Sequence, residues 1–233
     1  MYERDLAWIH AAGFGDFARS AAPGLIARLR SAGVRRGLIV ELGCGSGAAT
    51  RPLVAAGYEV LGLDASIEMI RLARRAVPRA RYSPARLPDA VLPPCDAVVA
   101  VGEVLNYMSR RADFDVLFKR VFEALRPGGV FLFDAKQPGF TVAGLTRGRS
   151  GKGWAVLSTS TEKPDGTLTR EIVSFRRADS AYRRSAETHR LTLLSARDLS
   201  RRLRAAGFTV RSTRAYGSFR LPPGHVLLEA GRK

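Results

Sequence analysis

The clearest candidates for chemistry are one acid and three glycines in the segment LIVELGCGSGAAT, residues 38–50. Glu41 comes before Gly43, Gly45 and Gly47, and the glycines follow an apolar run and precede a stretch expected to be helical. A glycine turn of this kind lets the backbone approach a nucleotide at the positive end of the helix. The same letters fit Gly-x-Gly-x-x-Ala, a pattern that would indicate NADP.

The charge of Glu41 bears on the choice of nucleotide. A carboxylate beside the glycine turn would repel a pyrophosphate. S-adenosylmethionine has no phosphate; its ammonium can be attracted by the acid, while amides of the turn take its carboxylate. Asp64 ends the next apolar run, YEVLGLD, and suits the two ribose hydroxyls of either cofactor. These residues together favour S-adenosylmethionine.

Apolar strand-like runs alternate with helical stretches over the first 134 residues. Strands are expected at 38–42, 58–64, 80–83, 95–102 and 130–134. Helices are expected at 2–12, 22–32, 48–56, 66–77 and 113–125, the second of them starting near Pro23. This alternation predicts an α/β fold in which helices cover both faces of a parallel sheet.

The pattern changes after residue 150. WAVLSTSTEKPDGTLTREIVSF predicts two strands around a Pro-Asp-Gly turn, and YRRSAETHRLTLL predicts a third. A short helix from Ser195 to Gly207 and strands near 208–216 and 225–231 close the chain. We therefore expect a single domain over residues 1–233 that consists of a helical cap (1–33), a cofactor-binding core (38–134), an antiparallel insertion (151–194) and a closing helix with strands (195–233).

These segments resemble the class I S-adenosylmethionine-dependent methyltransferases, in particular those that act on small molecules. VELGCGSG is similar to the first motif of that family, VLGLDASIEMI to its ribose-binding segment and CDAVVAVGEVLNYM to its fourth-strand segment, with LRPGGVFLFD downstream. The resemblance covers about residues 38–134, and the closing helix and strands suit the family's antiparallel end. It implies a Rossmann-like sheet, mostly parallel with an antiparallel C-terminal end, and S-adenosylmethionine as cofactor.

The resemblance also assigns residues to the cofactor. These are Glu41, Gly43, Gly45 and Asp64 at the methionine and ribose ends, Ala65 and Leu87 beside the adenine, Val101 and Gly102 beside the methionine, and Tyr2 on the N-terminal helix that covers the cofactor. Family members often carry an acid near the third strand that accepts from the adenine amine. Arg86 stands near that place, so Asp89 or a backbone carbonyl would have to substitute.

Candidates on the acceptor side are fewer. Glu103, Asn106 and Tyr107 follow the fourth strand, at the edge where open α/β sheets bind ligands, and are predicted to contact the substrate. His189 shares its strand face with two leucines, which favours a core histidine over a base or a substrate contact. His225 follows RLPPG and is expected to be a loop residue. A base is needed only where the acceptor arrives protonated.

The charge is strongly basic and unevenly distributed. The chain carries a net charge of +17, of which residues 1–146 contribute +5 and residues 147–233 contribute +12. The basic residues, nearly all arginine, are spread over many segments, which favours solvated side chains over a nucleic-acid surface. The two cysteines, Cys44 and Cys95, predict neither a disulfide framework nor a metal site. With no apolar run of membrane-spanning length and no secretory signal, a cytoplasmic location is expected.

Three functions remain open at this point. The first is methyl transfer from S-adenosylmethionine to a nitrogen or oxygen of a small molecule, with the insertion covering the acceptor. The second is methylation of RNA or protein through the basic C-terminal part, so a nucleic-acid partner stays possible. The third is a noncatalytic module that binds S-adenosylmethionine or NADP. The acceptor and the oligomeric state are not indicated by the sequence.

Overall fold

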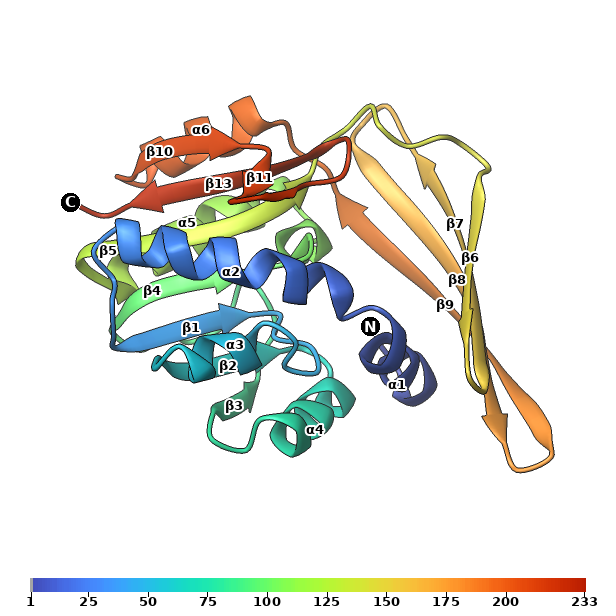
Figure 1. Ribbon diagram of the computed structural model, residues 1–233. Coiled ribbons are helices and arrows are strands. Elements are labelled where there is room, and N and C mark those ends of the chain that lie inside the picture. The colour runs from blue at the N-terminus through green and yellow to red at the C-terminus, as the bar shows by residue number, and fades with distance from the viewer. Residues whose placement is uncertain (1) are drawn as a thin grey trace.

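Seven strands form the central sheet of the computed structural model, which describes residues 2–233 (Figure 1). Their order is β10-β13-β5-β4-β1-β2-β3. The five strands β1–β5 are parallel, and β13 runs antiparallel between β5 and β10. Their bounds are β1 Leu38–Leu42, β2 Glu59–Asp64, β3 Arg81–Pro84, β4 Cys95–Ala100, β5 Leu125–Lys136, β10 Thr209–Thr213 and β13 His225–Gly231. The predicted Rossmann-like fold, parallel with an antiparallel C-terminal end, is confirmed.

Helices cover both faces of this sheet, because successive residues of the apolar strands point to opposite sides and both sides are buried. On one side Phe118, Phe131 and Phe133 pack together with α5 and α6. On the other side Ile39 and Val99 pack against α2 and α3. The helices are α1 Arg4–Gly13, α2 Asp16–Ser31, α3 Thr50–Ala55, α4 Ile67–Ala76, α5 Arg111–Ala124 and α6 Ala196–Ala205.

The helix α2 begins earlier than the sequence predicted. It starts at Asp16 rather than near residue 22, and Pro23 lies inside it. Ala21, Leu25 and Leu29, spaced by four residues, are all fully buried on the sheet. This continuous packing outweighs the cost of a proline inside a helix, which is about 3 kcal/mol. The proline rule therefore misplaced the helix start.

The insertion is a separate antiparallel sheet of four strands in the order β6-β7-β8-β9. Its strands are β6 Thr146–Gly151, β7 Trp154–Glu162, β8 Thr167–Ala178 and β9 Ala181–Thr192. The sequence predicted three of them and missed β6, because TRGRSG is exposed at every position and has no alternation of apolar residues. Figure 1 shows this sheet standing beyond the carboxyl ends of the parallel strands, with α1 beside it.

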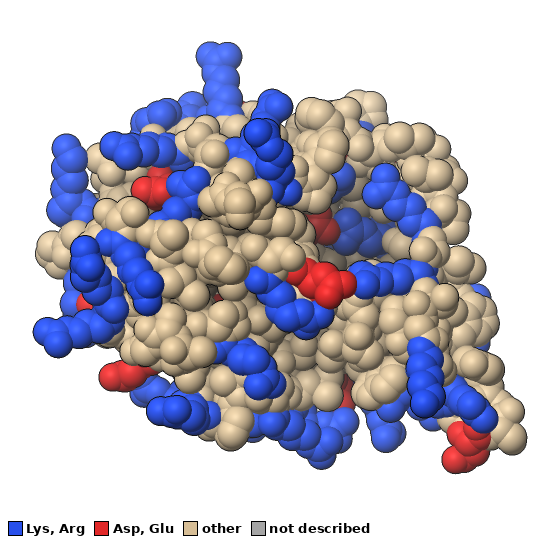
Figure 2. Space-filling model, in the orientation of Figure 1, with Lys and Arg blue, Asp and Glu red and all other residues tan. Residues whose placement is uncertain are grey.

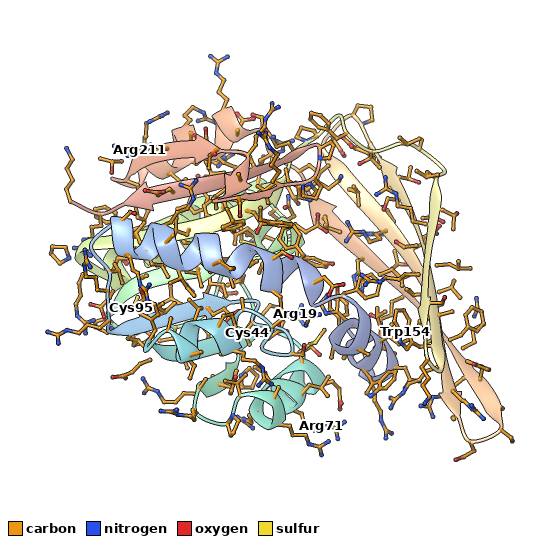
Figure 3. The ribbon with its side chains drawn as sticks, in the orientation of Figure 1. Arg19, Cys44, Arg71, Cys95, Trp154 and Arg211 are labelled. Atoms are coloured by element: carbon orange, nitrogen blue, oxygen red, sulfur yellow. The ribbon has the colours of Figure 1, made fainter. Side chains whose placement is uncertain are left out.

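Short elements complete the connection between the two sheets. The 3₁₀ helix η1 (Val104–Tyr107) follows β4 and contacts both β5 and β9. The small hairpin β11 (Ala215–Tyr216) and β12 (Phe219–Arg220) interrupts the strand predicted at 208–216. The Trp154 ring lies directly against α1, where a side chain at Gly13 would come within 2.4 Å of it (Figure 3). The helical cap thus packs against the insertion as well as the core.

Candidate functional site

One cavity of about 830 Å³ lies where the carboxyl edge of the parallel sheet, the N-terminal helices and the insertion meet. Figure 2 shows the surface hollowed at the junction of the insertion with the rest of the molecule. All but one of the predicted site residues line this cavity: Tyr2, Glu41, Gly43, Gly45, Asp64, Ala65, Leu87, Val101, Gly102, Glu103, Tyr107 and His189. Residues predicted separately as cofactor and acceptor contacts therefore share one space.

The exception is Asn106, which is 1% exposed and does not line the cavity. Its Nδ2 donates to the carbonyls of Lys136 and Thr192 at 3.0 and 2.9 Å, and its Oδ1 accepts from the Lys136 amide at 2.9 Å. The side chain thus joins β5 to β9. The prediction that Asn106 contacts the substrate is not supported, because its polar atoms are committed to the backbone.

The glycine turn leaves room for a ligand at one position and packs tightly at another. Gly43 and Gly45 have φ values of 62° and 54°, in the left-handed region that favours glycine. A Cβ at Gly43 would lie 2.4 Å from a methyl group of Val104, whereas a Cβ at Gly45 would meet nothing within 4 Å. The open space beside Gly45 belongs to the cavity and suits a cofactor lying against the backbone.

Asp64 fixes this turn through the backbone. One carboxylate oxygen accepts from the Gly45 amide at 2.9 Å, and the other accepts from the Ser66 amide at 2.8 Å. Ser66 in turn caps α4, because its hydroxyl accepts from the Met69 amide. Burial raises the pKa of Asp64. The end of β2, the glycine turn and the start of α4 are thereby held as one unit.

Glu41 adds a second buried carboxyl group to the same wall. Its side chain is 3% exposed and accepts from the Thr50 hydroxyl at 2.5 Å. Burial, aided by the nearby Asp64 and opposed by the Thr50 hydrogen bond, raises its pKa to about 8. Two buried carboxyl groups on one wall attract a cationic ligand and repel a phosphate. This donor set fits the ammonium and sulfonium of S-adenosylmethionine.

The expected adenine end has apolar side chains together with the polar Ser66 and Arg86. Ala65 and Leu87 line the cavity there with Met69. Asp89 does not substitute for the missing acid: it does not line the cavity and pairs at the surface with Arg120 at 3.6 Å. The sequence left Asp89 or a backbone carbonyl as the acceptor for the adenine amine, and only the backbone carbonyl remains as a candidate.

Asp134 holds the turn after β4 and was not predicted as a site residue. It is fully buried and accepts from the amides of Gly102 and Glu103, both at 2.8 Å, and from the Tyr216 hydroxyl at 3.0 Å. Glu103 has a φ of 55°, rare for a residue with a side chain. Asp134 stabilises this conformation, which points to a requirement of the site.

At the side where the acceptor is expected, Glu103 forms a buried charged cluster with two residues that the sequence did not indicate. Its carboxylate lies 2.8 Å from Nη1 of Arg170 and 3.4 Å from Nε2 of His225. Burial would raise the pKa of Glu103, but the contacts with His225 and Arg170 outweigh it and lower this pKa to about 2. His225 starts β13 rather than lying in a loop.

A hydrogen-bonded network connects the N-terminal segment to the insertion. The Tyr107 hydroxyl lies 3.5 Å from the Tyr2 hydroxyl and 3.4 Å from Nδ1 of His189, whose Nε2 lies 2.9 Å from a carboxylate oxygen of Glu187. The Ser66 hydroxyl donates to the Tyr2 carbonyl at 2.8 Å. His189 is 3% exposed, as expected of a core histidine, and still lines the cavity. The network thus connects the start of α4, beside Asp64, to β9 of the insertion.

Neither cysteine takes part in this chemistry as a thiolate. Cys44 lines the cavity within the glycine turn, and burial raises its pKa well above the usual value. Cys95 starts β4, at the opposite edge of the sheet from the glycine turn (Figure 3). Burial raises its pKa to about 12. Within residues 2–233, no group of three or more His, Cys, Asp or Glu side chains is placed to hold a metal ion.

Comparisons with known proteins agree with this geometry. A family model described as a methyltransferase domain matches residues 39–129. A putative methyltransferase of Bacillus subtilis is 35% identical over 104 residues, which cover 42% of each chain. The dTDP-3-amino-3,6-dideoxy-α-D-glucopyranose N,N-dimethyltransferase of Streptomyces fradiae is 27% identical over 221 residues, covering 87% of this chain and 81% of the relative. The first of these relatives is thus matched over less than half of its length.

Among solved structures, a sugar N-methyltransferase from Streptoalloteichus sp. is similar in fold. Its TM-score is 0.86 at 21% identity, and the match covers 100% of this chain and 95% of that chain. The sheet order, the glycine turn and the matched domain together define the class. Residues 39–129 thus match a methyltransferase domain, and the chain has the fold of the class I S-adenosylmethionine-dependent methyltransferases, with S-adenosylmethionine rather than NADP as the cofactor.

Proposed function

We propose that the protein transfers a methyl group from S-adenosylmethionine to a nitrogen of a small molecule, with an amine on a sugar as the favoured acceptor. The observation that carries this proposal is that one continuous cavity has the glycine turn on one wall and the insertion on the other. Its volume of about 830 Å³ falls within the range of small-molecule sites. Nitrogen is favoured over oxygen by the names of the Streptomyces fradiae relative and the Streptoalloteichus structure.

In this proposal the chain binds and orients two molecules. S-adenosylmethionine supplies a methyl group that its sulfonium already activates. Glu41, Gly43, Gly45 and Asp64 hold the methionine and ribose ends, while Ala65 and Leu87 flank the adenine and Val101, Gly102 and Tyr2 close the remaining sides. Holding the acceptor in line with the methyl group supplies most of the rate enhancement.

The wall formed by the insertion suits a polar acceptor. Ser158 and Ser160 of β7 and Arg170 of β8 line the cavity there, together with Thr188 of β9. Hydroxyl groups and a guanidinium can bind the oxygens of a sugar. We infer that the insertion determines which acceptor is used, and that the four predicted subdivisions of the chain correspond to cap, cofactor core, acceptor sheet and closing segment.

A macromolecular acceptor has less support. In the face shown in Figure 2, lysine and arginine side chains are scattered over many elements rather than gathered in one patch.

Within residues 2–233, no helix is long and apolar enough to cross a membrane. We propose a cytoplasmic enzyme.

The test is a methylation assay followed by mass spectrometry. The purified protein is incubated with S-adenosylmethionine and either dTDP-3-amino-3,6-dideoxy-α-D-glucopyranose or the matched compound with a hydroxyl at the same carbon. We expect one or two methyl groups on the amine and none on the hydroxyl compound. Methylation of the hydroxyl compound alone would refute the nitrogen assignment. Methylation of RNA that falls steeply with rising salt, with neither sugar modified, would refute the small-molecule acceptor.

A further inference from the structure

A buried charged cluster faces the cavity directly after the turn that follows β4. It consists of Glu103 directly before η1, Arg170 from β8 and His225 from the start of β13, and all three line the cavity. The side chains of Glu103 and His225 are only 16% and 15% exposed. Because Arg170 contacts one carboxylate oxygen of Glu103, the other oxygen faces His225.

Both ring nitrogens of His225 face acceptors. Nδ1 lies 3.3 Å from the carbonyl oxygen of Pro223, and Nε2 lies 3.4 Å from a carboxylate oxygen of Glu103. A neutral imidazole has one N–H group, so it can donate to only one of these acceptors at a time. When the hydrogen is on Nδ1, the Nε2 lone pair and the Glu103 oxygen form a pair of acceptors at the cavity wall, and a donor N–H group of a ligand would satisfy both.

We propose that Glu103 and His225 bind the protonated amine of the acceptor, and that Nε2 of His225 removes a proton from it before methyl transfer. This inference rests on the proposed amine acceptor. An ammonium cannot attack the methyl group, because its electron pair is held in an N–H bond. That N–H bond breaks, the proton goes to Nε2 and the pair stays on nitrogen as the nucleophile. The methyl group comes from the sulfonium, which leaves as the neutral thioether S-adenosylhomocysteine.

The backbone places this pair at the methionine end of the expected cofactor site. Glu103 directly follows Gly102, and the two amides are held by the same carboxylate of Asp134. Glu103 and His225 thus lie beside the segment that the proposed function assigns to the methionine. After proton transfer, the imidazolium of His225 would lie next to the carboxylate of Glu103, which stabilises it.

The charged and titratable neighbours make His225 the group that can exchange a proton. They are Arg170 from β8, Lys136 from β5, Tyr107 from η1, Tyr2 from the N-terminal segment and Asp134 behind the turn. The contacts of Glu103 keep its pKa at about 2, so it stays ionised. Burial raises the pKa of both tyrosines. Histidine is the side-chain type that changes charge near neutral pH.

The first test needs no acceptor. Long-range proton–nitrogen NMR of the protein bound to S-adenosylhomocysteine reports the tautomer of each histidine, and the chain has only three. His225→Gln assigns the signals. We expect His225 to carry its hydrogen on Nδ1 at pH 8, which leaves the Nε2 lone pair free at the cavity wall. A hydrogen on Nε2 would overturn the proposal.

The second test follows the pH dependence of kcat/KM with the amino sugar nucleotide. We expect an acidic limb in the native enzyme, and we expect His225→Gln to remove that limb and lower kcat/KM by about 10²-fold to 10⁴-fold with affinity for S-adenosylhomocysteine retained. His10→Gln changes another histidine of the same cavity, one that is half-buried, and should keep the limb. A limb that survives in His225→Gln refutes the base. If the native enzyme methylates neither sugar, the proposed acceptor fails while the NMR result still decides the pair.

Discussion

The two walls of the cavity are built in different ways. On the proposed cofactor wall, which is formed by the glycine turn and the end of β2, a carboxylate binds backbone amides: Asp64 accepts from Gly45 and Ser66. On the proposed acceptor wall, which is formed by the turn after β4, the insertion and the start of β13, side chains from distant segments contact one another, as Glu103 does with Arg170 and His225. The first arrangement depends on a few short segments, whereas the second exists only once the insertion and β13 are in place. Substitutions on the two walls should therefore separate cofactor binding from acceptor turnover.

The largest effect is expected at Asp64. Asp64→Ala removes both charge-assisted hydrogen bonds that hold the glycine turn, each worth about 1.5–3 kcal/mol. Affinity for S-adenosylhomocysteine, measured by isothermal titration, should fall by about 10²-fold or more. Asp64→Asn is the matched control, because its remaining oxygen can still accept, and it should lose less. Unchanged affinity in Asp64→Ala would remove Asp64 from the cofactor site.

The two glycines of the turn offer a paired comparison of stability. Both have left-handed φ values, so alanine costs about 1–2 kcal/mol in backbone strain at either position. Gly43→Ala adds a clash with Val104, whereas Gly45→Ala meets only open cavity. Urea denaturation should therefore show a larger loss of unfolding free energy for Gly43→Ala, by about 1–3 kcal/mol. Equal losses would contradict the close contact between Gly43 and Val104.

Asn106 tests the connection between the walls. Asn106→Ala leaves the Lys136 and Thr192 backbone groups unpaired in a buried position, and we expect a loss of about 2 kcal/mol in unfolding free energy. Because this contact joins β5 to β9, acceptor kcat/KM should fall further than affinity for S-adenosylhomocysteine. Asn106→Asp, of nearly equal size, sets a carboxylate against two carbonyls and should be no more stable than Asn106→Ala. Native stability in both variants would contradict the structural role.

The smallest expected effect is the release of a proton from Glu41 when the cofactor binds. Its pKa of about 8 means that the carboxyl group is mostly protonated at pH 7 in the free protein. The cofactor's ammonium favours the carboxylate, so binding lowers this pKa and should release up to about one proton. Isothermal titration at pH 7 in buffers of different ionisation enthalpy measures that number, with Glu41→Gln as the control that releases less. Proton uptake, or equal release by both proteins, would be inconsistent with contact between Glu41 and the ammonium.

The raised pKa of Glu41 also makes the unfolding free energy depend on pH. A carboxyl group with a raised folded pKa contributes stability that is present below its unfolded pKa, 4.5, and lost as pH rises towards about 8. The free protein should therefore lose unfolding free energy over this window, and Glu41→Gln should lose less. Urea denaturation at pH 5 and pH 8 measures the difference. A native protein that gains stability relative to Glu41→Gln over this window would contradict the buried carboxyl.

Much of the fold could be predicted because its signals are local. The parallel strands are buried on both faces and appear as apolar runs, and their ends carry the glycines and acids of the cofactor wall. The strand β6 could not be predicted, since its residues are all exposed and only pairing with β7 defines it. The start of α2 was misplaced because burial on the sheet overrides the usual position of a proline.

The acceptor wall was harder to predict because its residues meet through long-range pairing. His225 was assigned to a loop, yet β13 runs antiparallel to β5, which places its first residue beside Lys136 at the carboxyl edge. The antiparallel pairing of β13 with β5 was therefore the signal that could have identified His225 as a site residue. Arg170 has no distinguishing neighbours in the sequence and becomes notable only when β8 faces Glu103. Asn106 was placed at the correct edge, but its side-chain direction is set by β9.

The most direct test of the two-wall account is a titration of S-adenosylhomocysteine into Asp64→Ala and Arg170→Lys side by side. Arg170→Lys keeps a positive charge beside Glu103 but loses the guanidinium geometry of the acceptor wall. We expect Asp64→Ala to lose about 10²-fold or more in affinity, while Arg170→Lys stays within about twofold of the native protein. A comparable loss in both variants would show that the insertion also holds the cofactor, and would contradict the separation of the two walls.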